Sequence, residues 1–261
     1  MAPGFLSVDL GNSRCKLRCT EGPDPLHARI VAPVEFDTRA GLHFEVEQWL
    51  SKATLEIAGA AMSSVAASEL EDALAAVLTK QLGARFVRGL ECGLVIRCTE
   101  PERVGRDRLF AARGALALVR GSALVIDAGT ALTVDALSAE RVAQAAFLGG
   151  AIAPGPRLLA RALSSGTARL FEVEPVPGAR ALGRDTREAL AAGVAVGFAG
   201  AARELVLRVG AEAGLERAPV VLTGGARAFL LQPSIFAART VRTEPELVHL
   251  GLFSAWHASR T

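Results

Sequence analysis

Two apolar runs lie half a chain apart, and each ends in an Asp, a Gly and a small polar residue. The first is Val8-Asp9-Leu10-Gly11-Asn12-Ser13, and the second is Ile126-Asp127-Ala128-Gly129-Thr130-Ala131. A second strand-like run follows each Gly, and Gly lets the backbone turn tightly. The pattern therefore predicts two β-hairpins, each with a carboxylate at its tip.

Strands and helices alternate along the rest of the chain. A helix is predicted over Ser68–Leu82. Its acidic residues come early and Lys80 comes near its end, so the charges complement the helix dipole. Further helices are predicted over Glu45–Ala53 and about 107–120, and strands over Phe5–Leu10, Arg14–Arg18, Glu56–Ser63 and Leu124–Asp127. These elements predict an α/β fold with two similar halves, residues 1–115 and 116–261, and a cleft between them.

The composition is that of a globular chain with no sign of export. The 261 residues are 51% hydrophobic, and the formal charge of +2 is spread over interspersed acids and bases. No basic stripe favours a nucleic acid or an anionic membrane as a partner. The start, Met1-Ala2-Pro3-Gly4, lacks the features of a leader, and the apolar stretch Ala189–Ala202 is shorter than a membrane span needs. We therefore expect a soluble, cytoplasmic protein.

Residue spacing excludes several common active sites. Neither the four cysteines nor the four histidines are spaced as zinc ligands, so reduced thiols are expected. The chain also has no G-x-S-x-G elbow and no G-x-x-x-x-G-K-[ST] loop. Zinc sites and the familiar hydrolase and P-loop sites are therefore not expected.

The hairpin tips suit a metal-bound polyphosphate. Carboxylates are hard oxygen ligands for Mg²⁺, and Gly amides and Ser or Thr hydroxyls can approach phosphate oxygens closely. Two Gly-dense turns are predicted in the second half, at Gly149–Gly155 and Leu222–Gly225, where the backbone could also approach a ligand. The repeated pattern points to a nucleotide-dependent phosphotransferase.

Between the hairpins, Asp107 is flanked by Arg106 and Arg108 at the expected start of a helix. Taken alone, this segment is an ordinary acidic first turn with surface arginines. Between two phosphate-type hairpins, it instead suggests a carboxylate that accepts a hydroxyl proton and guanidinium groups that hold negative charge.

These segments together resemble the type III pantothenate kinases of bacteria. The matching motifs occur in the family's order and at compatible spacing over almost the whole chain. They are Asp9-Leu10-Gly11-Asn12-Ser13, Pro101 with Gly105-Arg106-Asp107-Arg108, Asp127-Ala128-Gly129-Thr130-Ala131, Gly149-Gly150-Ala151-Ile152-Ala153-Pro154-Gly155, Gly183-Arg184-Asp185-Thr186 and Thr223-Gly224-Gly225. One motif alone would be weak, whereas the ordered set is specific.

The resemblance implies the acetate-kinase, sugar-kinase, Hsp70 and actin fold, with two actin-like, ribonuclease H-like α/β domains and a nucleotide cleft. It implies a homodimer that transfers the γ-phosphate of ATP to the primary hydroxyl of pantothenate, the first step of coenzyme A synthesis. It also implies Mg²⁺ and a monovalent cation, K⁺ or NH₄⁺, as cofactors.

The resemblance also implies roles for both hairpins. The first would form an ATP phosphate loop from Asp9, Leu10, Gly11, Asn12, Ser13, Arg14, Cys15 and Lys16, with Asp9 near the metal. Lys16 suits phosphate charge, although an ordinary exposed strand residue is nearly as good an interpretation. In the second hairpin, Asp127 would bind the monovalent cation and Thr130 would contact phosphate.

The pantothenate pocket would be lined by Gly105, Arg106, Asp107 and Arg108, with Asp107 as the general base. Thr186 would close this pocket across the dimer interface. Its structural alternative is a helix N-cap, and both roles could coexist. A small-residue helix around Gly193 and Gly200 could pack within the subunit or across a two-fold axis.

One position departs from the family pattern. Family members usually carry a Tyr seven residues before the Gly of the Gly-x-Asp-Arg motif, and here that position is Cys98. A thiol is smaller than a phenol and a much weaker hydrogen-bond donor, so one contact to pantothenate should be lost or replaced.

Two other functions stay open. The chain could be a regulatory or catalytically idle homologue of the accessory-factor type, although the intact Asp9, Asp107 and Asp127 argue against it. It could also be a kinase for another small hydroxyl or carboxylate substrate, because fold alone does not fix substrate.

Overall fold

The computed structural model describes residues 4–25, 27–140, 144–236 and 239–260. Met1-Ala2-Pro3, where the sequence predicts no leader, lie outside the described residues. The chain divides into two compact units: unit 1 comprises residues 1–95, 99–120 and 246–261, and unit 2 comprises residues 96–98 and 121–245. This division differs from the predicted halves, because the C-terminal helix returns to unit 1.

Unit 1 contains a five-stranded sheet of order β3-β2-β1-β4-β5. The strands are β1 (Gly4–Leu10), β2 (Arg14–Glu21), β3 (Arg29–Asp37), β4 (Ile57–Ser64) and β5 (Phe86–Val87). β1 and β2 pair antiparallel, which confirms the first predicted hairpin. On its other side β1 pairs parallel with β4. The central strand therefore has its carboxyl end, at Asp9, beside the carboxyl end of β4.

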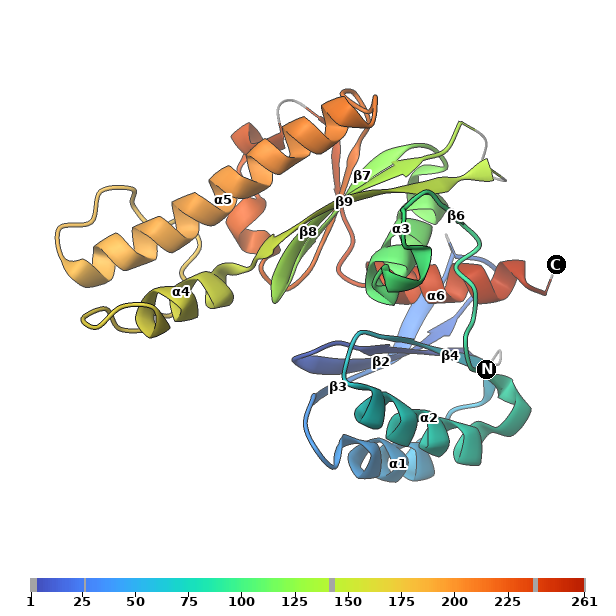
Figure 1. Cartoon of the computed structure of the whole chain (residues 1–261). Helices are drawn as coiled ribbons and strands as arrows, with labels where there is room; N and C mark the ends of the chain where they lie inside the picture. The colour runs from blue at the N-terminus through green and yellow to red at the C-terminus, as the bar shows by residue number, and fades with distance from the viewer. Residues whose placement is uncertain (1–3, 26, 141–143, 237–238, 261) are drawn as a thin grey trace. The chain divides into compact units, whose positions relative to one another are not determined.

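Helices lie on both faces of this sheet (Figure 1). On one face, α1 (Leu42–Lys52) and α2 (Ser68–Leu82) enclose an apolar core with Leu6, Val8 and Leu10 of β1. On the other, Phe5 stacks on Trp256 of α6 (Leu247–Ala258), with ring centroids 4.8 Å apart. Since side chains alternate along a strand, Ser7 and Asp9 follow Phe5 on the α6 face.

Two glycines allow a close crossing of α6 and α3 (Arg106–Val119). A Cβ atom on Gly114 of α3 would overlap the carbonyl oxygen of Leu247, and one on Gly251 of α6 would overlap the carbonyl oxygen of Phe110. The backbones of the two helices are therefore in direct contact, with no room for a methyl group between them.

Unit 2 contains a six-stranded sheet of order β11-β10-β7-β8-β9-β6. The strands are β6 (Val95–Ile96, which enters unit 2 at Ile96), β7 (Ala123–Ala128), β8 (Ala131–Ser138), β9 (Ala146–Pro154), β10 (Val220–Thr223) and β11 (Val241–Thr243). β7 and β8 pair antiparallel, which confirms the second hairpin. Side chains of the sheet, among them Leu124 and Ile126, form a core with Phe198 of α5 (Thr186–Glu212).

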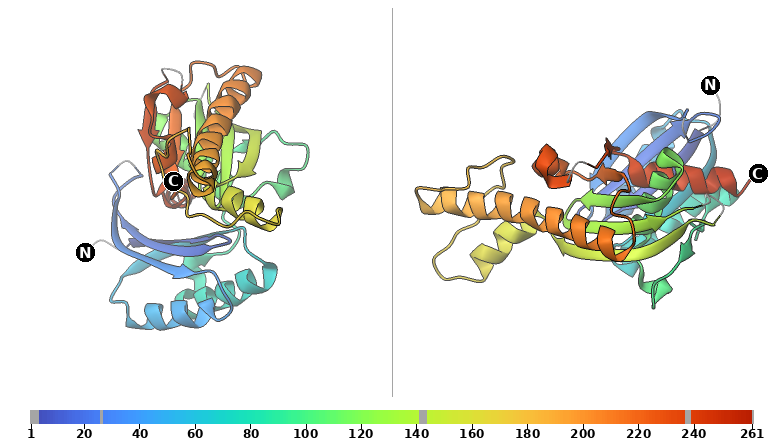
Figure 2. Two further views of the ribbon diagram at one scale, coloured as in Figure 1. Left: turned by 90° about the vertical axis from the view of Figure 1, so that its left-hand side faces the viewer. Right: turned by 90° about the horizontal axis from the view of Figure 1, so that it is seen from above.

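The long helix α5 corrects one expectation. With 27 residues, it is long and apolar enough to cross a membrane by length and composition, whereas Ala189–Ala202 alone suggested a shorter stretch. The core helix of a soluble protein passes the same test, and 39% of the apolar window of α5 is buried. α5 runs beside α4 (Pro156–Ser165), as Figure 2 shows.

Most predicted elements are present with small shifts. Helix Ser68–Leu82 is confirmed, the helix predicted from Glu45 begins at Leu42, and the one predicted from Asp107 begins at Arg106. Short 3₁₀ helices occur at Gly83–Arg85, Pro101–Arg103, Arg227–Leu230 and Pro233–Phe236.

The predicted turn at Gly149–Gly155 is wrong for most of its length. Residues up to Pro154 belong to β9, which pairs antiparallel with β8. Gly150 lies so close to β8 that a Cβ atom there would overlap the carbonyl oxygen of Val134. These glycines therefore serve strand pairing, and the sequence could not distinguish this from a turn.

Candidate functional site

The tip of the first hairpin divides the predicted phosphate loop into exposed and buried residues. Asn12, Ser13 and Arg14 are exposed, and the Gly11 N–H donates to the Arg14 carbonyl across the turn at 2.9 Å. Leu10 and Cys15 are fully buried in the core. Any contact that these two make with a phosphate must therefore come from their backbone.

Burial also explains the chemistry of Cys15. Burial, with a smaller contribution from the nearby Asp9 carboxylate, raises the pKa of this thiol to about 12. Cys15 is therefore an inert core residue, as expected for a reduced structural thiol.

A row of polar residues crosses the sheet at the level of Asp9. Asp9 is directly opposite Lys16 on β2 and Ser63 on β4, and Lys16 is opposite Glu35 on β3. Lys16 is half-buried, so it is not an ordinary exposed strand residue. Directly paired residues share one face of a sheet. The row therefore places a carboxylate between an ammonium group and a hydroxyl group.

Asp107 lies in the first turn of α3, after the N-cap residue Gly105. Its Oδ1 accepts a hydrogen bond from the Arg108 N–H at 2.8 Å. A Cβ atom on Gly105 would lie 2.6 Å from Asp107 Oδ1 and 3.5 Å from a methyl group of Val65. The carboxylate is therefore held against the start of the helix, near the segment that follows β4.

Burial raises the pKa of Asp107. The hydrogen bond from Arg108 and its guanidinium charge lower the pKa of this carboxyl by less. A solvated carboxylate in the first turn of a helix would not have its pKa raised by burial. Raised proton affinity in a half-buried carboxylate is typical of functional groups.

Arg106 lines a small pocket of unit 1. Its guanidinium donates to the Leu90 carbonyl at 2.5 Å and lies 5.3 Å from the centroid of the Phe110 ring. The pocket, of about 140 Å³, is lined by Met62, Ser64, Glu71, Phe86, Arg88, Gly89 and Arg106. The contacts with Leu90 and Phe110 thus hold the Arg106 side chain in place. Arg88, on the same pocket, forms an ion pair with Asp72.

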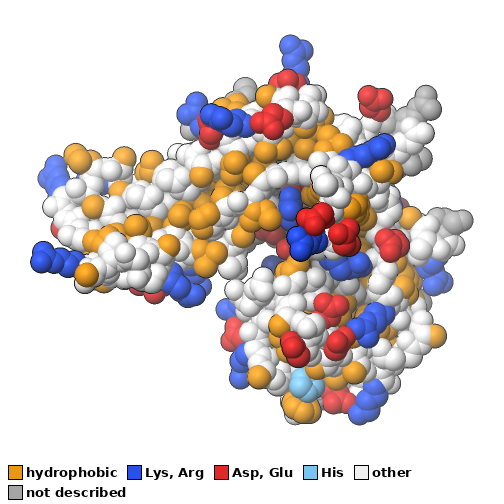
Figure 3. Space-filling model, viewed as in Figure 1, with side chains coloured by type: hydrophobic (Ala, Val, Ile, Leu, Met, Phe, Trp, Pro, Cys, Tyr) orange, Lys and Arg blue, Asp and Glu red, His pale blue; other side chains and the backbone are white. Residues whose placement is uncertain are grey.

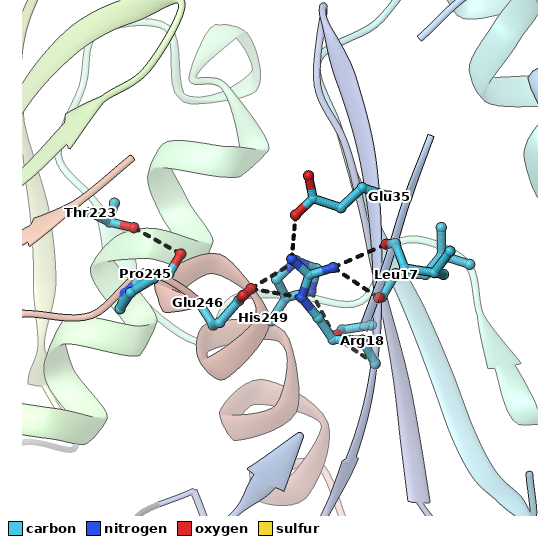
Figure 4. A network of polar contacts seen from close by, with 9 residues as sticks. Leu17, Arg18, Glu35, Thr223, Pro245, Glu246 and His249 are labelled. Carbon is cyan, nitrogen blue, oxygen red and sulfur yellow. Dashed lines mark hydrogen bonds and ion pairs between the residues drawn. The ribbon is translucent and has the colours of Figure 1, made fainter. Parts of the chain in front are cut away.

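A second polar group in unit 1 was not predicted from the sequence (Figure 4). Arg18 is 4% exposed, and its guanidinium bonds to Glu246 at 2.9 Å and to Glu35 at 2.6 Å. It also donates to the carbonyls of Leu17 and Val34. A buried charge needs such partners. The network joins β2, β3 and the start of α6.

His249 of α6 completes this network. Ser7 Oγ donates to the Arg18 carbonyl at 3.1 Å and lies 2.8 Å from His249 Nδ1. Because the single hydroxyl proton is used at the carbonyl, Nδ1 must carry the proton that joins His249 to Ser7. Burial, with smaller effects of Arg18 and Lys16, lowers the pKa of His249 well below its usual value. His249 is therefore neutral.

In unit 2, Asp127 lies at the end of β7 with Thr133 of β8 and Thr223 of β10 opposite it. Gly224 follows Thr223 with φ +94, and a Cβ atom there would overlap Asp127 Oδ1 and the Ala128 carbonyl oxygen. A carboxylate oxygen and a backbone carbonyl oxygen thus both lie against the backbone of Gly224, and the Ala128 carbonyl also accepts from the Ala226 N–H at 2.7 Å. Within the described residues no group of three or more His, Cys, Asp or Glu side chains could hold a metal ion.

The other predicted site residues of unit 2 lie in separate elements. Thr130 is exposed at the tip of the second hairpin, and its carbonyl accepts from the Gly155 N–H at 3.0 Å. Cys98 is half-buried, and its sulfur lies 3.7 Å from the Cβ position of Gly149. Cys98 therefore lies next to strand β9.

Thr186 is the exposed first residue of α5, which corrects the alternative that made it the N-cap. The N-cap is Asp185, whose carboxylate accepts from the Glu188 N–H at 2.8 Å. Since Asp185 already caps the helix, the hydroxyl of Thr186 is available for another role.

Comparison with known proteins identifies the family. A family model described as type III pantothenate kinase matches residues 5–208. A protein of that description from Moorella thermoacetica is 33% identical over 254 residues, which cover 95% of this chain and 96% of the relative. The chain belongs to the type III pantothenate kinase family. A type III pantothenate kinase from Salinispora arenicola is 30% identical over 95% of this chain and 96% of its own length. Similarity to one from Dehalococcoides mccartyi (strain CBDB1), at 35% identity, covers 56% of this chain and 54% of the relative.

Solved structures support the same fold at lower identity. A Baf family protein from Campylobacter jejuni, described as a transcriptional activator, superimposes with a TM-score of 0.60 at 19% identity over 98% of both chains. An inorganic polyphosphate/ATP-glucomannokinase from Arthrobacter sp. strain KM gives 0.54 at 14% identity over 99% of this chain and 100% of its own. The predicted actin-like α/β fold of the type III pantothenate kinases is therefore confirmed.

Proposed function

We propose that this chain transfers the γ-phosphate of ATP to the primary hydroxyl of pantothenate, which gives 4'-phosphopantothenate, the first step of coenzyme A biosynthesis. Membership of the type III pantothenate kinase family supports an ATP-dependent transferase. The observation that carries the proposal is the half-buried Asp107, with a raised pKa, at the start of α3. A carboxylate of this kind suits a hydroxyl acceptor.

In the proposed reaction Asp107 is the general base. The acceptor oxygen attacks the γ-phosphorus, the bond to the β–γ bridging oxygen breaks, and ADP leaves with that electron pair. The hydroxyl proton passes to the Asp107 carboxylate. Phosphoryl transfer depends mainly on positioning and charge neutralisation, so the base needs only to hold the hydroxyl and accept its proton late in the step.

Asp9 fits the role of magnesium-site residue. It lies at the carboxyl end of the central strand, beside the hydroxyl of Ser63 and opposite Lys16. Mg²⁺ would neutralise phosphate charge there. In the first hairpin, we propose that the Gly11–Arg14 turn contacts phosphate. Leu10 and Cys15 would contribute only backbone groups, and Lys16 would add positive charge.

In unit 2 we propose Asp127 as the ligand of K⁺ or NH₄⁺ and Thr130 as a second phosphate contact. The backbone of Gly224 and Ala128 next to the Asp127 carboxylate supports a cation site, because carbonyl and carboxylate oxygens suit a large monovalent ion. We propose that Gly105, Arg106, Arg108 and Cys98 contact pantothenate.

We further propose a homodimer that uses the outer face of α4 and α5. Val196 is 48% exposed, and Gly193, Gly197 and Gly200 beside it have no atom within 4 Å of their Cβ positions. Figure 3 shows apolar side chains gathered over these helices. Thr186 begins α5, so a partner copy on this face could receive its hydroxyl. The proposed location of this dimer is the cytoplasm, without nucleic acid or membrane as partner.

A second candidate is a kinase for another small hydroxyl compound, which the Cys98 departure favours. The two are separated by an assay of ADP release with pantothenate and a panel of other hydroxyl compounds, with Mg²⁺ and either K⁺, NH₄⁺ or Na⁺. We expect turnover of pantothenate that needs K⁺ or NH₄⁺ and is lost in Asp127→Ala. Activity on another compound, with none on pantothenate at millimolar concentration, would reject the proposal.

A further inference from the structure

Ser63 is a buried polar residue at the centre of the candidate site. It lies on β4, is 0% exposed, and its Oγ has no hydrogen-bond partner in the described part of the chain. Buried hydroxyls in native proteins are nearly always hydrogen-bonded, because an unsatisfied one lowers stability. An exception of this kind points to a partner outside the polypeptide.

The position of Ser63 shows where that partner would be. Ser63 is directly opposite Asp9 in the parallel ladder, so both side chains lie on the α6 face at the carboxyl edge of the sheet. Two residues further along, Val65 lies 3.5 Å from the Cβ position of Gly105, next to Asp107. Ser63 therefore lies between the expected metal-site carboxylate and the expected base.

The next row of the sheet provides a contrast. Ser7 precedes Asp9 on the same face of β1, and its hydroxyl donates to the Arg18 carbonyl and lies within hydrogen-bond distance of His249. The buried hydroxyl of Ser7, two residues before Asp9 on β1, thus has hydrogen-bond partners within unit 1. Nε2 of His249, beside Ser7, has no hydrogen-bond partner among the described residues either, but Ser63 is the unpartnered group directly opposite Asp9.

We propose that Ser63 is a positioning residue whose Oγ accepts a hydrogen bond from a water in the hydration shell of the divalent cation held by Asp9. This inference rests on the proposed function. Mg²⁺ usually keeps several waters in protein sites, and those waters donate hydrogen bonds, so they need acceptor oxygens around them. Residues in this outer shell commonly change metal affinity by about 10- to 100-fold when they are removed.

The neighbouring serine supplies a matched control. Ser64 lines the small pocket with Arg106, and its Oγ accepts from the Ala66 N–H at 3.4 Å. Since successive side chains of a strand point to opposite faces, Ser64 does not share the face of Asp9. Ser64→Ala is thus an equal change in size, one residue away, outside the proposed metal site.

The test uses the full chain, Mn²⁺ as the probe for Mg²⁺, and a non-hydrolysable ATP analogue. Mn²⁺ binding is measured by electron paramagnetic resonance, and folding by circular dichroism and Tm. We expect Ser63→Ala to weaken Mn²⁺ binding at least about tenfold, with an unchanged or higher Tm, because the lost hydroxyl has no protein partner. Ser63→Cys, which nearly keeps the volume but has a sulfur that is only a weak acceptor, should weaken binding similarly.

Each result has a clear meaning. Unchanged Mn²⁺ affinity in both Ser63 variants, or equal losses in Ser64→Ala, would overturn the role of Ser63 while the proposed function stands. A lower Tm with unchanged affinity would make Ser63 a structural residue. A wild-type protein that neither binds Mn²⁺ with the analogue nor phosphorylates pantothenate would overturn the proposed function and this inference together.

Discussion

Burial raises the pKa of Asp107 more than its arginine neighbour lowers it. Two flanking arginines, Arg106 and Arg108, would by themselves lower the pKa of this carboxyl. Arg106 instead donates to the Leu90 carbonyl and lies over the Phe110 ring. At the scale of single residues, the direction in which a charged side chain points therefore decides the proton affinity of its neighbour.

Asp107→Asn should lower kcat by about two orders of magnitude or more, because the amide cannot accept the hydroxyl proton. Nucleotide binding should persist. Asn can still accept from the Arg108 N–H, so Tm near neutral pH should be equal or higher, given that ionised Asp107 is disfavoured by burial. Steady-state kinetics and calorimetry check this.

The pH profile adds a second measurement for the same residue. A raised pKa means that the base form is lost at a higher pH than for an ordinary Asp, so wild-type kcat/KM should fall as pH decreases through that pKa. Near-wild-type turnover of the Asn variant would remove Asp107 from the role of base.

His249 should make stability depend on pH. Its folded pKa is depressed, so the native state binds fewer protons than the unfolded chain, and stability present above about pH 6.5 is lost as pH falls. Urea unfolding should show a loss approaching about 1.4 kcal/mol per pH unit from this group. His249→Gln should flatten that slope.

Cys98→Tyr tests the departure from the family pattern. If the thiol has lost a contact made equally in the ground and transition states, the Tyr variant should lower KM for pantothenate or leave it unchanged, with little effect on kcat. Cys98 adjoins β9, so the larger ring must fit beside Gly149. A raised KM in a folded variant would show that the pocket has adapted to the thiol.

At the scale of elements, close helix packing in unit 1 depends on glycine. Gly251→Ala should destabilise the protein by about 1–3 kcal/mol or more, because its Cβ would overlap the carbonyl oxygen of Phe110. Gly225→Ala is a change of the same size at a position with no atom within 4 Å of the Cβ, and it should stabilise the protein by up to about 1 kcal/mol. Chemical denaturation measures both, and equal effects would contradict the packing argument.

Element prediction succeeded where a pattern was local. The charges of Ser68–Leu82 and the Asp-x-Gly tips fixed a helix and two hairpins correctly. It failed at Gly149–Gly155, where glycines meet a neighbouring strand instead of a turn. A glycine shows that a side chain is absent, but the sequence does not show which backbone occupies the space.

At the scale of the whole molecule, the proposed homodimer can be tested on α5. Val196→Glu should convert a particle of twice the 27.2 kDa chain mass into a monomer at micromolar concentration, measured by light scattering. A charge on an apolar dimer face is left desolvated and unpaired. Glu212→Lys, at the exposed C-terminal end of the same helix and on a different face from Val196, should remain dimeric. A fully active monomer would contradict both the dimer and a role for Thr186 across it.

The sequence by itself determined the hairpins, the fold class and the family, because these depend on residues that are close in the chain and on an ordered set of motifs. Only the tertiary structure decided which polar groups share a face. Arg18, Glu35, Glu246 and His249 come from distant segments, and Ser63 joins Asp9 through the parallel pairing of β1 with β4. Burial and register arise from long-range packing, so pKa values and unsatisfied hydroxyls follow from the fold and not from neighbouring letters in the sequence.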